Sequence, residues 1–286
     1  MPDKVSLDRY AVMGVSYLQY SFSAFLDSMA ACGFRHLDFW GGAPHYCRLD
    51  WPNQLAAEHQ LARLRKEIEA RGMDVVMYTP ETLSYPFSLA SPEKPIRKRT
   101  EAYFAAACQD ALALGVNRLF LTSGSAPRDL SRADSWCRML ESVARIAETA
   151  RSMGVSLVVE ALQPYESNLL NSLSDMEQLL AEVDSPALQV CLDVVAMATA
   201  GETMEDWLDR LGRQICWVHF ADSNHQVPGE GSLPLNHWLT LLHQRNYQAY
   251  IDLEINDSMY WENPHAAMLR TAAWLKGIPG RQEENL

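Results

Sequence analysis

The chain has few of the features that are typical of secreted proteins, membrane proteins or zinc-finger proteins. Its six cysteines are scattered along 286 residues without one C-x-x-C pair, so neither a zinc-knuckle spacing nor a disulfide framework is indicated. Its most apolar stretches, such as 155–162 and 190–200, each contain an acid and are far shorter than the roughly 20 residues of a membrane-spanning helix. The N-terminal residues carry acids where a signal peptide would carry a basic start and an apolar run. We therefore expect a cytoplasmic protein without membrane association.

Basic residues are also scarce. The chain has 24 Lys and Arg against 36 Asp and Glu, which gives a formal net charge of −12. A protein that binds duplex phosphates needs a basic stripe. The densest basic cluster here is one short run that is typical of a solvated helix face: Lys94, Arg97, Lys98 and Arg99. We expect no nucleic-acid partner.

Short runs rich in Val, Ile, Leu and Phe alternate with longer amphipathic segments, and this alternation is typical of βα units with a parallel sheet. The strands are expected near 11–16, 35–40, 74–79, 118–123, 156–161, 188–194, 215–221 and 249–255. The helices are expected near 21–32, 55–71, 95–114, 132–153, 173–183, 203–211, 234–245 and 264–276. Four glycines at helix-to-strand junctions support these limits, because a helix often ends on a left-handed residue: Gly33, Gly72, Gly115 and Gly154.

Eight successive βα units predict an α/β fold in which residues 1–286 form a single (β/α)8 TIM barrel. No Ser/Gly-rich linker or low-complexity tract divides the chain. The competing dinucleotide-binding fold lacks its fingerprint, since no G-x-G-x-x-G follows the first expected strand. P-loop and G-x-S-x-G sequences are absent as well, which disfavours nucleotide-binding and serine-hydrolase functions.

Four consecutive strands are expected to end on an acid or an imidazole. The strand sequences are Ser156-Leu-Val-Val-Glu160, Gln189-Val-Cys-Leu-Asp193, Cys216-Trp-Val-His219 and Ile251-Asp-Leu-Glu254. The active site of a TIM barrel lies at the C-terminal ends of its strands, so these side chains should meet at one barrel mouth. Any one of them could cap a helix or pair with an arginine, but four at equivalent positions indicate a shared site.

Three carboxylates that converge inside a protein repel one another unless a cation lies between them. Glu160, Asp193, His219 and Glu254 would together form a hard, oxygen-rich ligand set. Such a set suits one divalent metal ion, with Mn²⁺ expected first and Mg²⁺, Co²⁺ or Zn²⁺ as alternatives.

The two glutamates lie on strands three apart around the ring, so they can face each other across the cation with substrate between them. A metal-chelated ketone or hydroxyl acidifies the adjacent C–H and stabilises a cis-enediolate, while one carboxylate removes the proton and the other returns it. Transfer on opposite faces of one carbon gives epimerisation. Transfer on one face between neighbouring carbons gives aldose–ketose isomerisation.

These residues resemble the sugar isomerase/epimerase family with a xylose-isomerase-like TIM barrel, and within it the fructoselysine 3-epimerases and the ketose 3-epimerases of the D-tagatose 3-epimerase type. The resemblance spans nearly the whole chain. Besides the strand ends it rests on Trp40-Gly-Gly-Ala-Pro-His45, Tyr78-Thr-Pro-Glu81, Pro164-Tyr-Glu-Ser-Asn168, His219 followed by Asp222, and Pro228-Gly-Glu-Gly231. The resemblance implies that Glu160, Asp193, His219 and Glu254 hold the metal. It also implies that the two glutamates exchange the proton at C3 of a ketose or of a ketose–amino acid conjugate.

The resemblance further implies substrate contacts by His45, Glu166 and His225. The chain departs from many ketose 3-epimerases at two positions, with Ala196 where they have a histidine and His225 where they have an arginine. Both departures concern how the substrate is held, so its identity stays open. Relatives of this kind also imply a homodimer or homotetramer acting on a small sugar.

Other functions would use the same or a related barrel. An inosose-type dehydratase or a hydroxypyruvate-type isomerase would keep the metal quartet. An apurinic-site endonuclease would need several additional histidines, and the net charge of −12 opposes its binding to duplex DNA. A barrel that only binds a sugar and a metal would need no paired carboxylates for proton transfer.

Overall fold

Eight short parallel strands hydrogen-bond side by side in chain order and close into a barrel. The computed structural model describes residues 7–83 and 86–277. The strands are β1 (Tyr10–Met13), β2 (His36–Gly41), β3 (Asp74–Pro80), β4 (Arg118–Thr122), β5 (Ser156–Glu160), β6 (Leu188–Asp193), β7 (Ile215–Phe220) and β8 (Tyr250–Leu253). The pairing of β1 with β8 closes the ring and confirms the expected (β/α)8 TIM barrel. The boundaries 1–286 of a single domain stay a prediction.

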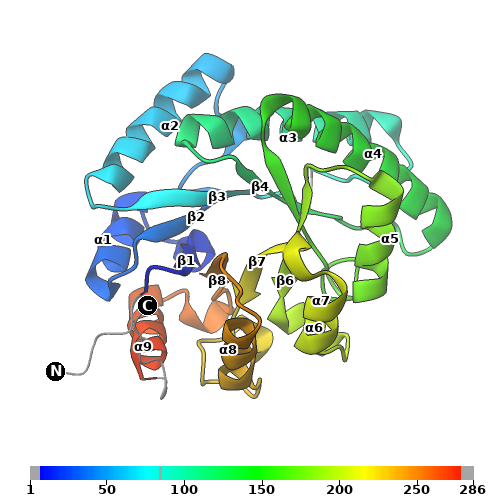
Figure 1. Cartoon of the computed structure of the whole chain (residues 1–286). Helices are drawn as coiled ribbons and strands as arrows, with labels where there is room; N and C mark the ends of the chain where they lie inside the picture. The colour runs from blue at the N-terminus through cyan, green and yellow to red at the C-terminus, as the bar shows by residue number, and fades with distance from the viewer. Residues whose placement is uncertain (1–6, 84–85, 278–286) are drawn as a thin grey trace.

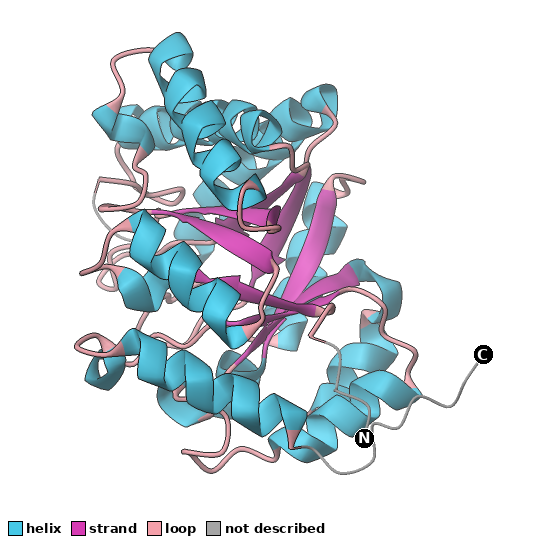
Figure 2. Cartoon of the chain, turned by 90° about the vertical axis from the view of Figure 1, so that its left-hand side faces the viewer, coloured by secondary structure: helices cyan, strands magenta, loops and turns pink. Residues whose placement is uncertain are grey.

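The helices lie outside the ring of strands (Figures 1 and 2). They are α1 (Phe22–Cys32), α2 (Gln54–Glu69), α3 (Lys94–Leu114), α4 (Arg132–Met153), α5 (Leu173–Val183), α6 (Val194–Thr199), α7 (Met204–Arg210), α8 (Leu235–Gln244) and α9 (Pro264–Lys276). Short 3₁₀ helices are η1 (Gly14–Tyr17), η2 (Arg48–Asp50), η3 (Gly212–Gln214), η4 (Ser223–His225) and η5 (Ser258–Tyr260). Within the described residues, no helix has the length and apolar character needed to span a bilayer.

One expected boundary was wrong, and one helix was not expected. The first strand ends at Met13 and not at residue 16, because the following residues form the 3₁₀ helix η1. The strand expected near 188–194 is β6, and the apolar residues after Asp193 form the short helix α6, which was not among the expected helices. Asp193 begins this helix, since its side chain accepts a hydrogen bond from the Val195 backbone N–H, a favoured arrangement at a helix N-terminus.

Successive residues of most strands face opposite sides of the barrel wall. Leu157, Val159, Val190 and Leu192 pack in the large apolar cluster that includes the helices, whereas Val158 belongs to a smaller cluster that contains only strand residues. The members of that smaller cluster are Ala11, Val76, Met77, Phe120, Val158, Cys191 and Trp217. It fills the interior of the barrel, because inward and outward residues alternate along a barrel strand.

Candidate metal and active site at the barrel mouth

The four strand-end residues lie at one end of the barrel interior. Glu160 is the last residue of β5, Asp193 is the last residue of β6, His219 lies one residue before the end of β7, and Glu254 follows β8 directly. Asp193 and His219 are paired in register across β6 and β7. Because these four strands are consecutive in the ring, their inward-facing ends meet over the core of the barrel.

Two of the carboxylates contact the same imidazole nitrogen. His219 Nδ1 lies 2.6 Å from Glu160 Oε1 and 3.2 Å from Glu254 Oε2. His219 and Glu160 are buried, and the side chain of Glu254 is 15% exposed. The glutamates therefore approach one point from β5 and from the end of β8, and Glu254 keeps access to solvent.

His225 adds a second imidazole to this group. It belongs to η4 and is 5% exposed, and its Nε2 lies 3.4 Å from Asp193 Oδ2 and 3.6 Å from Glu254 Oε2. The residue was expected to contact substrate. Its position beside two of the expected metal ligands brings it into the centre itself.

A third group of buried donors lies deeper in the barrel, and the sequence interpretation missed it. Asp38 on β2 and Asp252 on β8 have donor atoms within 4.8 Å of each other and of His219, and His219 Nε2 lies 3.4 Å from Asp252 Oδ2. Thr79 donates to Asp38 Oδ2 at 2.8 Å, but both Asp252 oxygens lack a hydrogen bond. The period of two along a strand could have found Asp252, because it lies two residues before Glu254 and so faces the same side.

The sequence interpretation missed Cys191 too, although the same period of two along a strand could have found it. It lies two residues before Asp193, and its Sγ lies 3.6 Å from Glu160 Oε1. Burial raises the pKa of this thiol well above its usual range, so Cys191 stays a neutral neighbour of the centre.

The electrostatics of the centre reflect burial of several acids together. Burial, followed by the charges of neighbouring carboxylates, raises the pKa of Glu160 to about 7 and that of Asp193 to about 7. Burial and then the charge of Asp252 raise the pKa of Asp38 well above its ordinary value. At Glu254 burial also acts to raise the pKa, but the charge and hydrogen bond of His219 outweigh it, so the pKa is lowered.

The donor set fits a divalent cation. Among the described residues, the ion-pair partners of Glu160, Asp193 and Glu254 are His219 and His225 alone, with no lysine or arginine. Buried carboxylates are stable when they are paired with a full charge or coordinate a metal. Carboxylate oxygens with one or two imidazoles suit Mn²⁺, Fe²⁺ or Co²⁺, and carboxylates alone suit Mg²⁺.

The remaining substrate candidates have different surroundings. Glu166 accepts a hydrogen bond from the Gln163 backbone N–H at 3.0 Å, and burial followed by the charge of Glu160 raises its pKa to about 7. His45 is 5% exposed, stacks on Phe25 and places its Nε2 3.2 Å from the Tyr20 carbonyl oxygen. Glu166 thus lies in the electrostatic environment of the centre, whereas His45 packs in an aromatic cluster. A substrate role for either stays a prediction.

A cavity of about 760 Å³ shares Glu166 with this region. Its walls are largely apolar, and they come from the loops after β3, β4 and β5 and from the first turns of α3. Lining residues include Leu83, Phe87, Ile96, Arg99 and Tyr165. Tyr165 is 74% exposed, so an aromatic face is available beside the centre.

Fold and site together define a TIM barrel with buried groups of carboxylates and histidines at its mouth that could bind a metal ion. The family described as xylose isomerase-like TIM barrel matches residues 26–278, and the chain belongs to this family. It is 28% identical over 246 residues to the fructoselysine 3-epimerase of Escherichia coli O157:H7, covering 84% of this chain and 87% of that protein. It is 24% identical over 252 residues to the D-psicose 3-epimerase of Agrobacterium fabrum, covering 84% and 82% of the two chains.

Solved structures show the same fold. D-allulose 3-epimerase from Methylomonas in complex with D-allulose superposes with a TM-score of 0.77 at 17% identity and covers 94% of this chain and 96% of that chain. The curated relatives are epimerases, which confirms the expectation of an enzyme of the isomerase class.

Proposed function

We propose that the protein is a metal-dependent sugar epimerase that inverts C3 of a ketose or of a ketose–amino acid conjugate. The observation that carries the proposal is the approach of Glu160 and Glu254 to the same His219 nitrogen, at 2.6 and 3.2 Å. Inversion at one carbon needs a proton acceptor and a proton donor on opposite sides of that carbon. Two carboxylates from strands on different sides of the ring meet that need.

Glu160, Asp193, His219 and Glu254 would hold the cation, with Mn²⁺ the expected ion. A bound cation would polarise the substrate carbonyl and hydroxyl and would offset the negative charge that develops when the C3 proton leaves. One glutamate would take the C3 proton, and the other would deliver a proton to the opposite face. Glu254, partly exposed, lies where substrate can reach it.

The substrate class is supported by the cavity beside the centre. At about 760 Å³ its volume lies within the roughly 300–1,000 Å³ of sites for drug-sized ligands, so a substituent on the sugar could be accommodated. Glu166 would contact the sugar at the entrance of this cavity. The fructoselysine 3-epimerase relative is named for such a conjugate, and the psicose epimerase relative for a free ketose.

Proton NMR in D₂O tests the reaction. Manganese-loaded and metal-free protein are incubated with fructose, tagatose, psicose and fructoselysine. We expect deuterium at C3 and the C3 epimer only in the loaded samples. A product that is the substrate minus one water would instead indicate the dehydratase. Proton transfer between neighbouring carbons, which converts the ketose to an aldose, would indicate an aldose–ketose isomerase.

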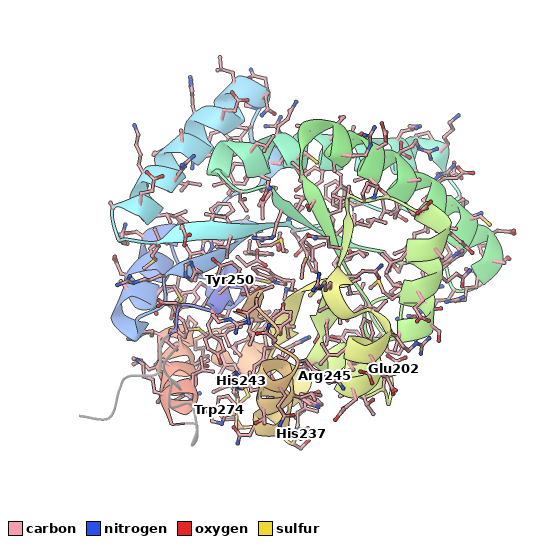
Figure 3. All side chains as sticks on the ribbon, viewed as in Figure 1. Glu202, His237, His243, Arg245, Tyr250 and Trp274 are labelled. Carbon is pink, nitrogen blue, oxygen red and sulfur yellow. The ribbon has the colours of Figure 1, made fainter. Side chains whose placement is uncertain are left out.

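Variants assign the exchange to the two glutamates. Glu160→Gln and Glu254→Gln should each abolish exchange, because an amide accepts no proton at neutral pH. Glu202→Gln is the matched control, since Glu202 lies outside the strands near α7 (Figure 3). Full exchange in both active-site variants would overturn the assignment.

A further inference from the structure

The imidazole of His225 lies between two carboxylates of the centre, and nothing in the proposed function uses it there. Its Nε2, Asp193 Oδ2 and Glu254 Oε2 all lie within 4.8 Å of one another. Glu254 Oε2 is also 3.2 Å from His219 Nδ1. One carboxylate oxygen therefore lies within 3.6 Å of both imidazoles.

The spacing is that of ligands sharing one ion. Hydrogen bonds from an N–H group to oxygen are normally about 2.7–3.2 Å long, so the contacts of 3.4 and 3.6 Å made by His225 Nε2 are long for hydrogen bonds. Two ligand atoms about 2.1 Å from one cation, at angles of about 90–120°, lie roughly 3.0–3.7 Å apart. Both distances fall in that interval.

The β7–α8 loop holds the ring in this position. Asn224 and His225 both have left-handed backbone conformations, with φ of 58° and 55°. Residues other than glycine seldom adopt this conformation. The His225 carbonyl oxygen accepts hydrogen bonds from the backbone N–H groups of Asn256 and Asp257, just beyond Glu254. The loop is thus tied to the segment that carries one of the metal ligands.

We propose that His225 Nε2 is a fifth protein ligand of the divalent cation, an inference that rests on the proposed function. The complete set would be three carboxylates and two imidazoles. A second imidazole favours first-row transition ions over Mg²⁺, which prefers oxygen ligands. The chain would therefore select Mn²⁺, Fe²⁺ or Co²⁺ more strongly than a site with a single imidazole.

Pulsed EPR of the Mn²⁺-loaded full chain tests this directly by counting nitrogen ligands. We expect ¹⁴N couplings from two imidazoles in the wild type and from one in His225→Phe and His225→Gln. Calorimetric titration should show Co²⁺ affinity falling at least about tenfold in both variants, with a much smaller change for Mg²⁺. His36→Gln is the matched control, because His36 begins β2 at the opposite end of the barrel, and it should keep both couplings.

The outcomes separate this inference from the proposed function. A single imidazole coupling in the wild type, or two couplings that persist in a folded His225 variant, would overturn the inference and leave the epimerase intact. No Mn²⁺ binding by the wild type would overturn both. Circular dichroism establishes that each variant is folded, and the wild-type spectrum alone decides the question if neither His225 variant folds.

Discussion

Asp252 and Asp38 are buried carboxyl groups of the same type at the same depth of the barrel, yet their surroundings differ. Asp38 accepts a hydrogen bond from Thr79, and its raised pKa, caused by burial and by the charge of Asp252, favours the protonated form. Asp252 faces His219 Nε2 at 3.4 Å. A histidine that binds a metal through one nitrogen usually donates from the other to a carboxylate or carbonyl. Asp252 is therefore placed to hold Nδ1 of His219 toward the proposed cation.

We predict that Asp252→Asn weakens Mn²⁺ binding by about 10–100-fold, the usual effect of removing such a partner. The amide keeps the size of the side chain but loses the charge that orients and polarises the imidazole. The affinity is measured by titrating metal-free protein and following the free Mn²⁺ signal by EPR.

Asp38→Asn is the matched comparison in the same layer. Because a protonated Asp38 already carries no charge, the Mn²⁺ affinity of the Asp38→Asn variant should lie within a few-fold of that of the wild type. If the two variants lose Mn²⁺ affinity equally, Asp38 and Asp252 contribute only through packing, and the orienting role of Asp252 is wrong.

At the scale of elements, hydrophobic periodicity predicted the barrel and the strand-end residues but not the fine placement of donors. Glu160 and Asp193 ended their strands as expected, since a charged residue after an apolar run marks the end of a buried strand. Asp38 and Cys191 escaped notice because they lie within strands, where a polar residue has meaning only once its inward direction is known. The contact of His225 depends on the left-handed backbone conformations of Asn224 and His225. The sequence alone does not show which Asn or His residues adopt this conformation.

The β7–α8 loop depends on one buried carboxylate. Asp222, 2% exposed, accepts hydrogen bonds from the backbone N–H groups of Ser223, Gly229 and Leu233 at 2.8–2.9 Å. Asp222→Asn turns an amide group toward at least one of these donors and should lower the free energy of unfolding by roughly 1–3 kcal/mol. Because the same loop carries His225, we also expect weaker Co²⁺ binding. Urea unfolding and calorimetry measure the two effects.

Glu202→Gln is the matched control, because it also replaces a loop carboxylate that accepts a backbone hydrogen bond. Glu202 accepts from the Leu173 backbone N–H at the start of α5 and from the Trp207 indole N–H, and neither partner contacts the centre. This variant should lose comparable stability without loss of metal affinity. If Asp222→Asn likewise binds Co²⁺ normally, the loop does not position His225.

At the scale of the whole molecule, burial of the acids links metal binding to stability. The pKa values of Glu160, Asp193 and Glu166 are raised to about 7, above the roughly 3.9–4.3 of unfolded chains. Their contribution to stability is therefore complete below about pH 4 and is lost as the pH rises through 7. Glu254, whose pKa is lowered, acts in the opposite sense only in the acid range below its unfolded value.

We therefore predict that the metal-free protein becomes less stable between pH 5 and pH 8, whereas the stabilisation by Mn²⁺ grows over the same range, because a metal binds ionised carboxylates and displaces their protons. At free metal of 100 times Kd the gain is about 2.7 kcal/mol, which for a chain of 286 residues is a rise in Tm of about 4–5 °C. Calorimetric scans at several pH values, with Mn²⁺ or with chelator, measure how Tm changes with pH in both states.

Asp193→Asn, which removes one titrating group, should make the Tm of the metal-free protein less dependent on pH. A metal-free Tm independent of pH from 5 to 8 would contradict the raised pKa values, and a Mn²⁺ shift as large at pH 5 as at pH 8 would mean that the cation binds elsewhere than at these carboxylates.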